Sequence, residues 1–366
     1  MEGNKAESGF LELDQGKVAE SLKDVFGEST SLLSVRRLGA GVLGFVYVLE
    51  IVCEGEKRKI VLKMANPSGF GQDFPADRAD TLIYANSVYD KLPFHVKSFD
   101  VGAITPDGRL KKLGDAQEFF LLMEHVEGEE YAKDLDRIAE TGRIEDLDVE
   151  KTLLLAEYMA QIHKVKHDSP GLYVRRIRDL VGRGDCITGI IDSYPRDERT
   201  YGFTSDDELE EIEKLCIKWR WKLRGKDSRL CQVHGDLHPF NILWQGPYEF
   251  VLLDRSRGEW GEAADDVSCL SINYIFWSLK TWNSYREPFK TLFENLLDHY
   301  LELTNDVELM KVIAPFYAFR SLVIANPLFY PNLSNENRRR LFNFMRNVLE
   351  AEAFEPSKVE SYLMKG

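Results

Sequence analysis

Hydrophobic and polar positions follow two different patterns along this chain, and the change falls near Gly128. Before it, apolar runs rich in β-branched and aromatic residues predict strands. Two other segments repeat their apolar residues at helical spacing, so we expect a strand-rich unit with about one helix packed on its sheet. The predicted strands cover 31–38, 45–52, 57–65 and 116–128, and the helical segments cover 16–27 and 77–92.

After Gly128 helical spacing dominates. In 148–165, for example, Leu155, Met159 and Ile162 fall on one face of a helix. Helical spacing also appears in 205–223, in 262–304 and from 306 onward, whereas 231–254 contains three short strand-like pieces. The pattern therefore predicts a small α+β lobe over 1–126 and a larger, mainly helical lobe over 127–366 that carries an inserted hairpin.

Composition narrows the class of protein. The 366 residues are 44% hydrophobic, which is enough for a large core. The formal net charge of −14 argues against a nucleic-acid surface, because phosphate backbones need a basic face. The five cysteines are scattered without a CxxC pair, which fits a reducing compartment. The N-terminus has no secretory-signal pattern, and no apolar run approaches the roughly 18 residues of a membrane span. We expect a cytoplasmic protein without a nucleic-acid or membrane partner.

Gly39, Gly41 and Gly44 form a GxGxxG motif between the first two predicted strands. In a dinucleotide-binding fold the third glycine opens a helix, but here the β-branched run 45–52 follows. The glycines therefore fit a turn between antiparallel strands, where backbone N–H groups approach phosphates because no Cβ intervenes. An ordinary glycine-rich hairpin is the alternative.

Lys63 lies inside the third predicted strand, on the face opposite Leu62 and Met64. Burying a lysine is costly unless it meets an anion, so a phosphate under the glycine turn would suit it. An edge-strand lysine that extends to water is the alternative. The following helix offers Asp77 and Asp80 as carboxylate partners, and we favour Asp80.

The stretch QVHGDLHPFNILW (232–244) carries the most specific chemistry. Asp236 and Asn241 bracket a tight turn, and a predicted hairpin then delivers Asp254. An Asn and an Asp brought together across a hairpin are hard oxygen ligands suited to Mg²⁺ shared with phosphate oxygens. Asp236 could accept a proton from an incoming hydroxyl. Three polar turn residues are the plainer interpretation, but the order of glycine turn, lysine, Asp-x4-Asn and Asp favours chemistry.

These motifs resemble the aminoglycoside phosphotransferase/choline kinase superfamily, which has a bilobal, protein-kinase-like fold. HGDLHPFNIL (234–243) is similar to that superfamily's HGDLHPGNIL, and the spacing of its acidic and amide residues matches the phosphoryl-transfer template of protein kinases. LLMEHVEG (121–128) resembles the hinge. GEAADDVS (261–268) is similar to the GDPAYDLA segment, which places Asp266 at a structurally important aspartate. The resemblance covers roughly residues 30 to 275.

The resemblance implies a role for each matching residue. Asp236 would be the catalytic base or the acid that orients the hydroxyl, and Asn241 and Asp254 would hold Mg²⁺. Lys63 would contact the α and β phosphates of ATP, paired with Asp80 or Asp77. The backbone of Gly39, Gly41 and Gly44 would cover the phosphates, and the backbone from Glu124 to Val126 would meet the adenine edge. His234 would support the loop structurally, and the same role is favoured for His238.

Three departures from the family pattern stand out. The family usually has a glutamate where we place Asp80. Phe240 replaces a small residue before the asparagine. Arg255 and Arg257 follow the metal-binding aspartate, where an aromatic or aliphatic residue is usual. The two arginines could bind an anionic part of the acceptor, reach the nucleotide phosphates, or pair with acids such as Glu259 and Glu262.

The leading hypothesis is an ATP- and Mg²⁺-dependent kinase that phosphorylates a hydroxyl of a small molecule. A catalytically silent ATP-binding scaffold is the alternative, although such proteins usually lack one of the Asp, Asn or Lys residues present here. A protein kinase fits less well, because only about a dozen residues separate Asp254 from ADDV (264–267) and leave little room for an activation loop. The acceptor class stays open among aminoglycosides, sugars, amino alcohols and hydroxy amino acids.

Overall fold

The computed structural model describes residues 13–41, 44–66, 72, 75–111, 118–255 and 257–365. The chain divides into two compact units, with the boundary after Val126. We call residues 1–126 unit 1 and residues 127–366 unit 2. The fold class is α+β, with an antiparallel sheet in unit 1 and mainly helices in unit 2, as the sequence predicts.

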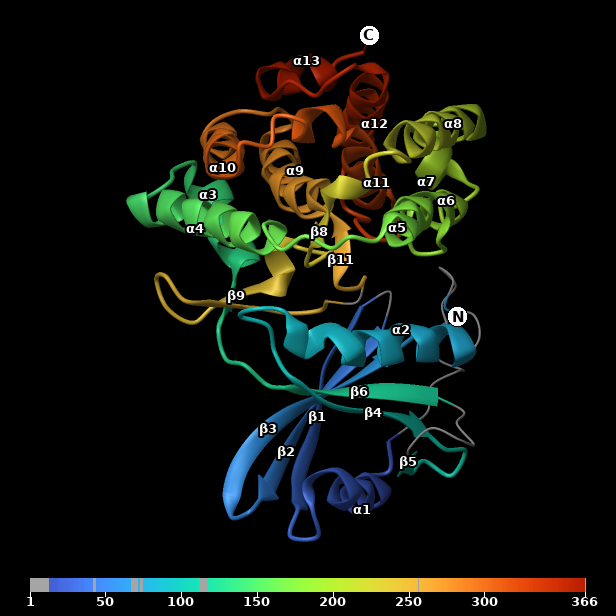
Figure 1. Ribbon diagram of the computed structural model, residues 1–366, viewed down its shortest axis with the longest axis vertical. Helices are drawn as coiled ribbons and strands as arrows, with labels where there is room; N and C mark the ends of the chain where they lie inside the picture. Colours follow the sequence, from blue (N-terminus) through green and yellow to red (C-terminus); the bar gives the residue numbers. More distant parts are fainter. Residues whose placement is uncertain are drawn as a thin grey trace, which may run out of the picture. The chain divides into compact units, whose positions relative to one another are not determined.

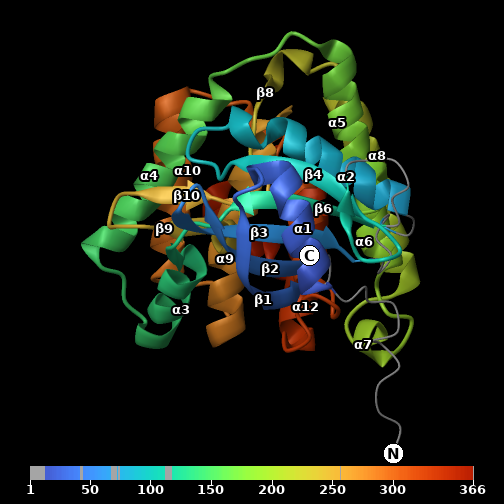
Figure 2. The same ribbon diagram turned by 90° about the horizontal axis from the view of Figure 1, so that it is seen from below.

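Unit 1 is built on a curled six-stranded antiparallel sheet with the order β1-β2-β3-β6-β4-β5. All four predicted strands are confirmed, whereas β4 and β5 were not predicted. Figure 2 shows β1, β2 and β3 side by side, with α1 crossing in front of them. The strands are β1 (Ser31–Gly41), β2 (Gly44–Cys53), β3 (Glu56–Ala65), β4 (Ser98–Ile104), β5 (Leu110–Lys111) and β6 (Glu118–Glu124).

Two helices cover the sheet of unit 1, where the sequence predicts about one. Helix α1 (Gln15–Phe26) lies beside β1 and β5, and its Val18 and Leu22 join the apolar core of the sheet. Helix α2 (Pro75–Val88) lies along β6 and β4 on the opposite face (Figure 1) and continues into the short η1 (Tyr89–Lys91). A buried ion pair between Arg78 and Glu118, at 2.8 Å, fastens α2 to β6.

Unit 2 is a helical assembly around α9 (Ala263–Trp282), most of whose residues are buried. Helices α3, α4, α10 and α11 pack against it, which explains why its sequence is apolar nearly all round. The helices predicted in 148–165, 205–223 and 262–304 are confirmed. Besides α9, the described part of unit 2 contains the helices α3 (Tyr131–Thr141), α4 (Asp146–His163), α5 (Pro170–Gly182), α6 (Ile187–Asp192), α7 (Glu198–Tyr201), α8 (Asp206–Leu223), α10 (Phe289–Thr304), α11 (Ala314–Ala325), α12 (Asn335–Glu350) and α13 (Val359–Tyr362).

Two small sheets interrupt the helices of unit 2. Strands β9 (Ile242–Trp244) and β10 (Phe250–Leu252) form the predicted hairpin, and β7 (Glu129–Glu130) pairs with β9. Strand β8 (Leu230–Gln232) pairs with β11 (Trp260–Glu262). Together they fix both ends of the segments 233–241 and 253–259, which carry the candidate site. In the part of the chain that the structure describes, no helix is long and apolar enough to cross a membrane.

Candidate functional site

Asp266, in the first turn of α9, fixes the backbone of the loop between β8 and β9. Its two carboxylate oxygens accept hydrogen bonds from the backbone N–H groups of His234, at 2.8 Å, and Gly235, at 2.7 Å. His163 on α4 lies 3.2 Å from the same carboxylate through Nε2. Asp266 is fully buried, so its role is to fix the loop backbone, as the resemblance implies.

Gly235 gives this loop its sharp change of direction. Its φ of 86° lies in the left-handed region, and an added Cβ would come within 3.0 Å of the Arg257 Cβ. The next residue, Asp236, donates its backbone N–H to His234 Nδ1 at 3.2 Å. His234 is wholly buried, which agrees with the structural role that the sequence predicts. The loop therefore presents the Asp236 carboxylate from a rigid backbone.

Asn241 and the residue before Asp254 are neighbours across the hairpin. Ile242 pairs with Leu252, and the Leu253 N–H donates to the Asn241 carbonyl oxygen at 2.9 Å. The Asn241 side chain donates through Nδ2 to the Asp236 carbonyl oxygen, also at 2.9 Å. The hairpin thus brings Asn241 next to the segment that ends in Asp254, as the sequence predicts.

Asp254 has a backbone φ of 57°, in the left-handed region that non-glycine residues rarely adopt. Such a conformation costs about 1–2 kcal/mol and is concentrated at functional sites. This backbone conformation turns the chain sharply after the end of β10, next to Asn241.

Arg320 is a site residue that the sequence analysis missed. It lies on α11, is 6% exposed, and donates from Nη1 to the Asp236 carboxylate at 2.5 Å. Its Nη2 donates to the Gly235 carbonyl oxygen at 2.9 Å and to the Asp265 carboxylate at 2.6 Å. The signal in the sequence is a single arginine inside the apolar run APFYAFRSLVIA (314–325), since a buried charge requires a partner of opposite sign.

The charge state of Asp236 follows from these contacts. Burial alone would raise the pKa of this carboxyl group, but the positive charges of Arg320 and Arg257 hold the pKa well below its usual range. Asp236 is therefore ionised at neutral pH. His238, whose Nε2 lies 3.7 Å from the carboxylate, has its pKa lowered by burial.

Arg255 and Arg257 have different environments. Arg255 is fully buried, and its guanidinium group donates to the carbonyl oxygens of Val233 and Glu259 at 3.0–3.1 Å. In this structure the Arg255 guanidinium therefore links two segments of backbone, and substrate binding by Arg255 stays a prediction. Arg257 instead places its Nε 3.9 Å from the Asp236 carboxylate. Of the two arginines, Arg257 is therefore the one whose side chain lies near Asp236.

In unit 1 the glycine motif lies in the β1–β2 hairpin, with Gly41 paired to Gly44. This confirms the predicted antiparallel turn, although residues 42 and 43 at its tip lie outside the described residues. A Cβ on Gly44 would approach the Met64 carbonyl oxygen of β3 to 2.3 Å. The third glycine is therefore required by the close packing of β2 on β3. Gly39 is the β1 partner of Val46.

Lys63 lies on β3, opposite Leu121 of β6, and is partly buried. Its neighbours Leu62 and Met64 point into the apolar core, so Lys63 faces the other side of the sheet, as predicted. Asp80 is exposed on α2, and no ion pair joins it to Lys63 among the residues that the structure describes. Asp80 as the partner of Lys63 stays a prediction, and Asp77, in the first turn of α2 and partly buried, stays the alternative.

The segment from Glu124 to Val126 begins at the last residue of β6. Glu124 pairs with Ile60 of β3, and its N–H donates to the Lys97 carbonyl oxygen at 3.0 Å. The Glu124 N–H is therefore already used within unit 1, and any contact of Glu124 with a base edge would involve its carbonyl oxygen.

The residues of the hairpin fit a magnesium ion. Because the Asn241 amide nitrogen is bonded to the Asp236 carbonyl oxygen, its Oδ1 is the atom left to face a ligand. Mg²⁺ usually takes one or two protein oxygens and completes its shell with water and substrate phosphates. One amide oxygen and one carboxylate, from Asn241 and Asp254, match that donor set.

Comparisons with known proteins agree on the fold. The pattern that defines the phosphotransferase enzyme family, APH, matches residues 55–303. Amicoumacin kinase hAmiN, solved in complex with AMP-PNP, Ca²⁺ and Ami, has a TM-score of 0.54 and 15% identity, over 89% of this chain and 91% of that chain. A thermostable mutant of the aminoglycoside phosphotransferase APH(4)-Ia has a TM-score of 0.51 and 15% identity, over 91% of this chain and 98% of that one. No curated protein sequence matches significantly.

Proposed function

Because the chain belongs to the phosphotransferase enzyme family, we propose that it transfers the γ-phosphoryl group of ATP to a hydroxyl of a small molecule. The observation that carries this proposal is the ionised Asp236 carboxylate, held on a rigid loop beside the Asn241–Asp254 hairpin. Phosphoryl transfer needs positioning and charge neutralisation more than covalent chemistry from the protein. This site is suited to both.

Asp236 would accept a hydrogen bond from the acceptor hydroxyl and orient its oxygen toward the phosphorus. Its lowered pKa makes it a weak base, so orientation of the hydroxyl is its main contribution until the proton is released late in the reaction. Arg320 would fix the rotamer of the carboxylate through the 2.5 Å hydrogen bond. Arg320 is thus a positioning residue, which acts through Asp236.

Asn241 and Asp254 would hold Mg²⁺, which when bound neutralises charge on the phosphates. In unit 1, Lys63 would contact the α and β phosphates, and the backbone of Gly39, Gly41 and Gly44 would cover them. The Glu124 carbonyl oxygen and the Val126 backbone would meet the adenine edge. We assign ATP rather than another nucleotide by resemblance to the family.

Replacing Asp236 by Asn tests the proposal. D236N keeps the shape of the side chain but removes its charge, so acceptor-dependent ADP release should fall by about 10²-fold or more. Mg-ATP affinity, measured by calorimetry, should change by less than about threefold. D298N on α10, an exposed aspartate, is the matched control and should behave as wild type. Near-normal turnover in D236N would refute the role of Asp236. Tight ATP binding without turnover in wild type, for every acceptor tried, would favour the silent scaffold.

A further inference from the structure

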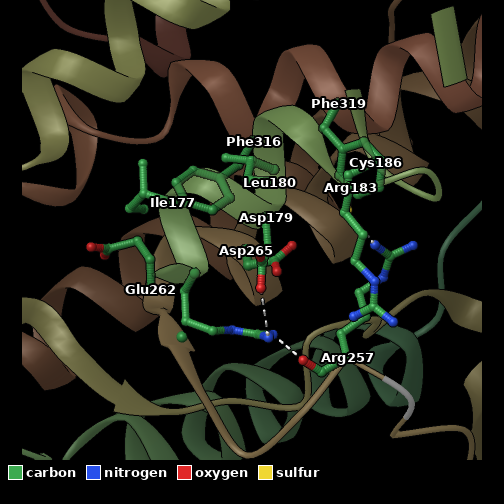
Figure 3. Close-up of a pocket in the computed structure, with 12 residues that line it drawn as sticks. Ile177, Asp179, Leu180, Arg183, Cys186, Arg257, Glu262, Asp265, Phe316 and Phe319 are labelled. Atoms are coloured by element: carbon green, nitrogen blue, oxygen red, sulfur yellow. Dashed lines mark hydrogen bonds and ion pairs between the residues drawn. The ribbon is translucent and has the colours of Figure 1, made fainter. Parts of the chain in front are cut away.

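A pocket in unit 2 lies between α5, the start of α6, α11 and the segment 257–265 (Figure 3), and its lining residue Arg257 is 3.9 Å from the Asp236 carboxylate. Apolar side chains of α5 and α11 form one wall. Figure 3 shows Arg183 and Arg257 near each other at one end of the pocket, with Asp265 and Asp179 further in. The charged side chains that line it are Arg176, Arg183, Arg257, Asp179, Glu262 and Asp265.

The carboxylates of this pocket already have cationic partners. Glu262 accepts hydrogen bonds from Arg229, at 2.7 and 3.0 Å, and from the Tyr173 hydroxyl at 2.9 Å. Asp265 accepts from Arg320 at 2.6 Å. Asp179 lies 3.4–3.9 Å from three arginines of α5. A polycationic acceptor would have to compete with these arginines for every carboxylate, so the pocket does not favour one.

Arg257, in contrast, lacks a strong acceptor. Its side chain is 14% exposed, yet the nearest carboxylate oxygens, of Asp185 and Asp236, lie 3.7 and 3.9 Å away, beyond hydrogen-bond distance. Nη1 donates to the weakly accepting Cys186 sulfur at 3.1 Å, and Nη2 reaches the Asp185 carbonyl oxygen only at 3.5 Å. Within the described part of the chain, nothing accepts from the buried Nε.

A second positive charge, that of Arg320, approaches the same Asp236 carboxylate as Arg257. The guanidinium carbons of Arg257 and Arg320 lie 4.9 and 4.7 Å from the centroid of the same ring, that of Phe319. The Arg320 guanidinium already donates hydrogen bonds to Asp236 and Asp265. Arg257 is therefore the one of the two with N–H groups available to a ligand. Because Arg257 is also 3.9 Å from Asp236, a ligand held by Arg257 would have its other end within reach of that carboxylate.

We propose that the hydroxyl acceptor carries an anionic group, a carboxylate or a phosphate, which Arg257 binds while the acceptor hydroxyl lies against Asp236. A guanidinium presents planar paired donors that match both kinds of anion. This inference rests on the proposed function for the transfer step. The binding of the anion itself does not depend on turnover, and the two are tested separately.

The first test measures anion binding directly. Calorimetry of the full chain with saturating Mg-ADP should detect binding of inorganic phosphate or acetate, and the two probes distinguish a phosphate site from a carboxylate site. In R257Q the affinity should fall about ten- to a hundredfold, the range expected for hydrogen bonds to a charged group. R143Q, which changes an exposed arginine between α3 and α4 that does not line the pocket, is the matched control and should bind as wild type. Binding of neither anion, or equal binding by R257Q, would overturn the proposal.

The second test compares acceptors in matched pairs. Ribose 5-phosphate is set against ribose, glycerate against glycerol, and kanamycin serves as a polycation. We expect the anionic member of at least one pair to show about ten- to a hundredfold higher kcat/KM, mainly through KM, and R257Q to remove that preference. Equal or better turnover of the neutral compounds or kanamycin would contradict the inference. Absence of turnover throughout, with Arg257-dependent anion binding intact, would support the anion site and count against the transferase.

Discussion

Replacing Arg320 by Gln should destabilise unit 2 and disable the site together. The substitution removes a buried positive charge and its hydrogen bonds to the carboxylates of Asp236, at 2.5 Å, and Asp265, at 2.6 Å. It leaves both carboxylates, each 17% exposed, without their main partner.

The size of the effect follows from these contacts. A hydrogen bond to a charged group contributes about 1.5–3 kcal/mol, so losing two gives roughly 3–6 kcal/mol. Breaking a buried ion pair from one side costs about 3–5 kcal/mol. Since water reaches both carboxylates and Arg257 lies near Asp236, we expect the lower end, about 3 kcal/mol of unfolding free energy. That is a large share of the ~5–15 kcal/mol typical of a domain.

Urea denaturation, monitored by circular dichroism, measures this loss of unfolding free energy. A double-mutant cycle with D265N then shows how much of the loss comes from the ion pair between Arg320 and Asp265. Once Asp265 is neutral, R320Q leaves one carboxylate without its partner rather than two. The double variant should therefore lose at least about 1 kcal/mol less unfolding free energy than the sum of the losses in the two single variants. R338Q is the control, because Arg338 is equally buried but donates only to carbonyl oxygens. It should destabilise the protein and add to D265N without coupling. A loss below about 1 kcal/mol for R320Q, or full additivity with D265N, would refute the ion-pair account.

Three further predictions concern packing, metal binding and pH. G44A should lower the stability of unit 1 by about 1–3 kcal/mol in thermal unfolding, because its Cβ would lie 2.3 Å from a β3 carbonyl oxygen; G171A, which meets nothing within 4 Å, should change stability little. D254N should raise the Mg²⁺ concentration needed for half-maximal ADP release by about tenfold or more, and chelation by EDTA should abolish release in wild type; an unchanged Mg²⁺ requirement would exclude Asp254 as a ligand. For Asp306, burial acts to raise the pKa but hydrogen bonds from Arg229 lower it in the folded state. Its stabilisation is therefore present above the unfolded-state pKa of about 3.9 and is lost as pH falls below it, so D306N should unfold with a flatter dependence on pH in that acidic range than wild type.

Local pattern was enough to predict most of the fold. The strands of unit 1 and the long helices of unit 2 show their periodicity directly, because each buries one face. Strands β4 and β5 were missed. Only the end of β4 is buried, and β5 has two residues, so neither shows a clear alternation. The closeness of Asn241 to Asp236 and to the segment that ends in Asp254 was predictable, because the hairpin brings together residues that are close in sequence.

The rest of the site depends on tertiary contacts. Arg320 lies 84 residues from Asp236, and only the fold of α11 against α9 brings the two together. Arg255 and Arg257 look equivalent in sequence, but Arg255 turns into the core while Arg257 faces Asp236. In the same way, the choice between Asp77 and Asp80 depends on which side of α2 faces the sheet, and the sequence does not specify that rotation closely enough.

The most direct measurement of the central claim is phosphorus NMR of a reaction containing Mg-ATP and the best acceptor of the panel. The account predicts a new phosphate monoester on the acceptor hydroxyl, formed in equal amount to ADP, with neither product accumulating in D236N. ADP that appears with free phosphate alone, or a monoester that forms as fast in D236N as in wild type, would contradict it.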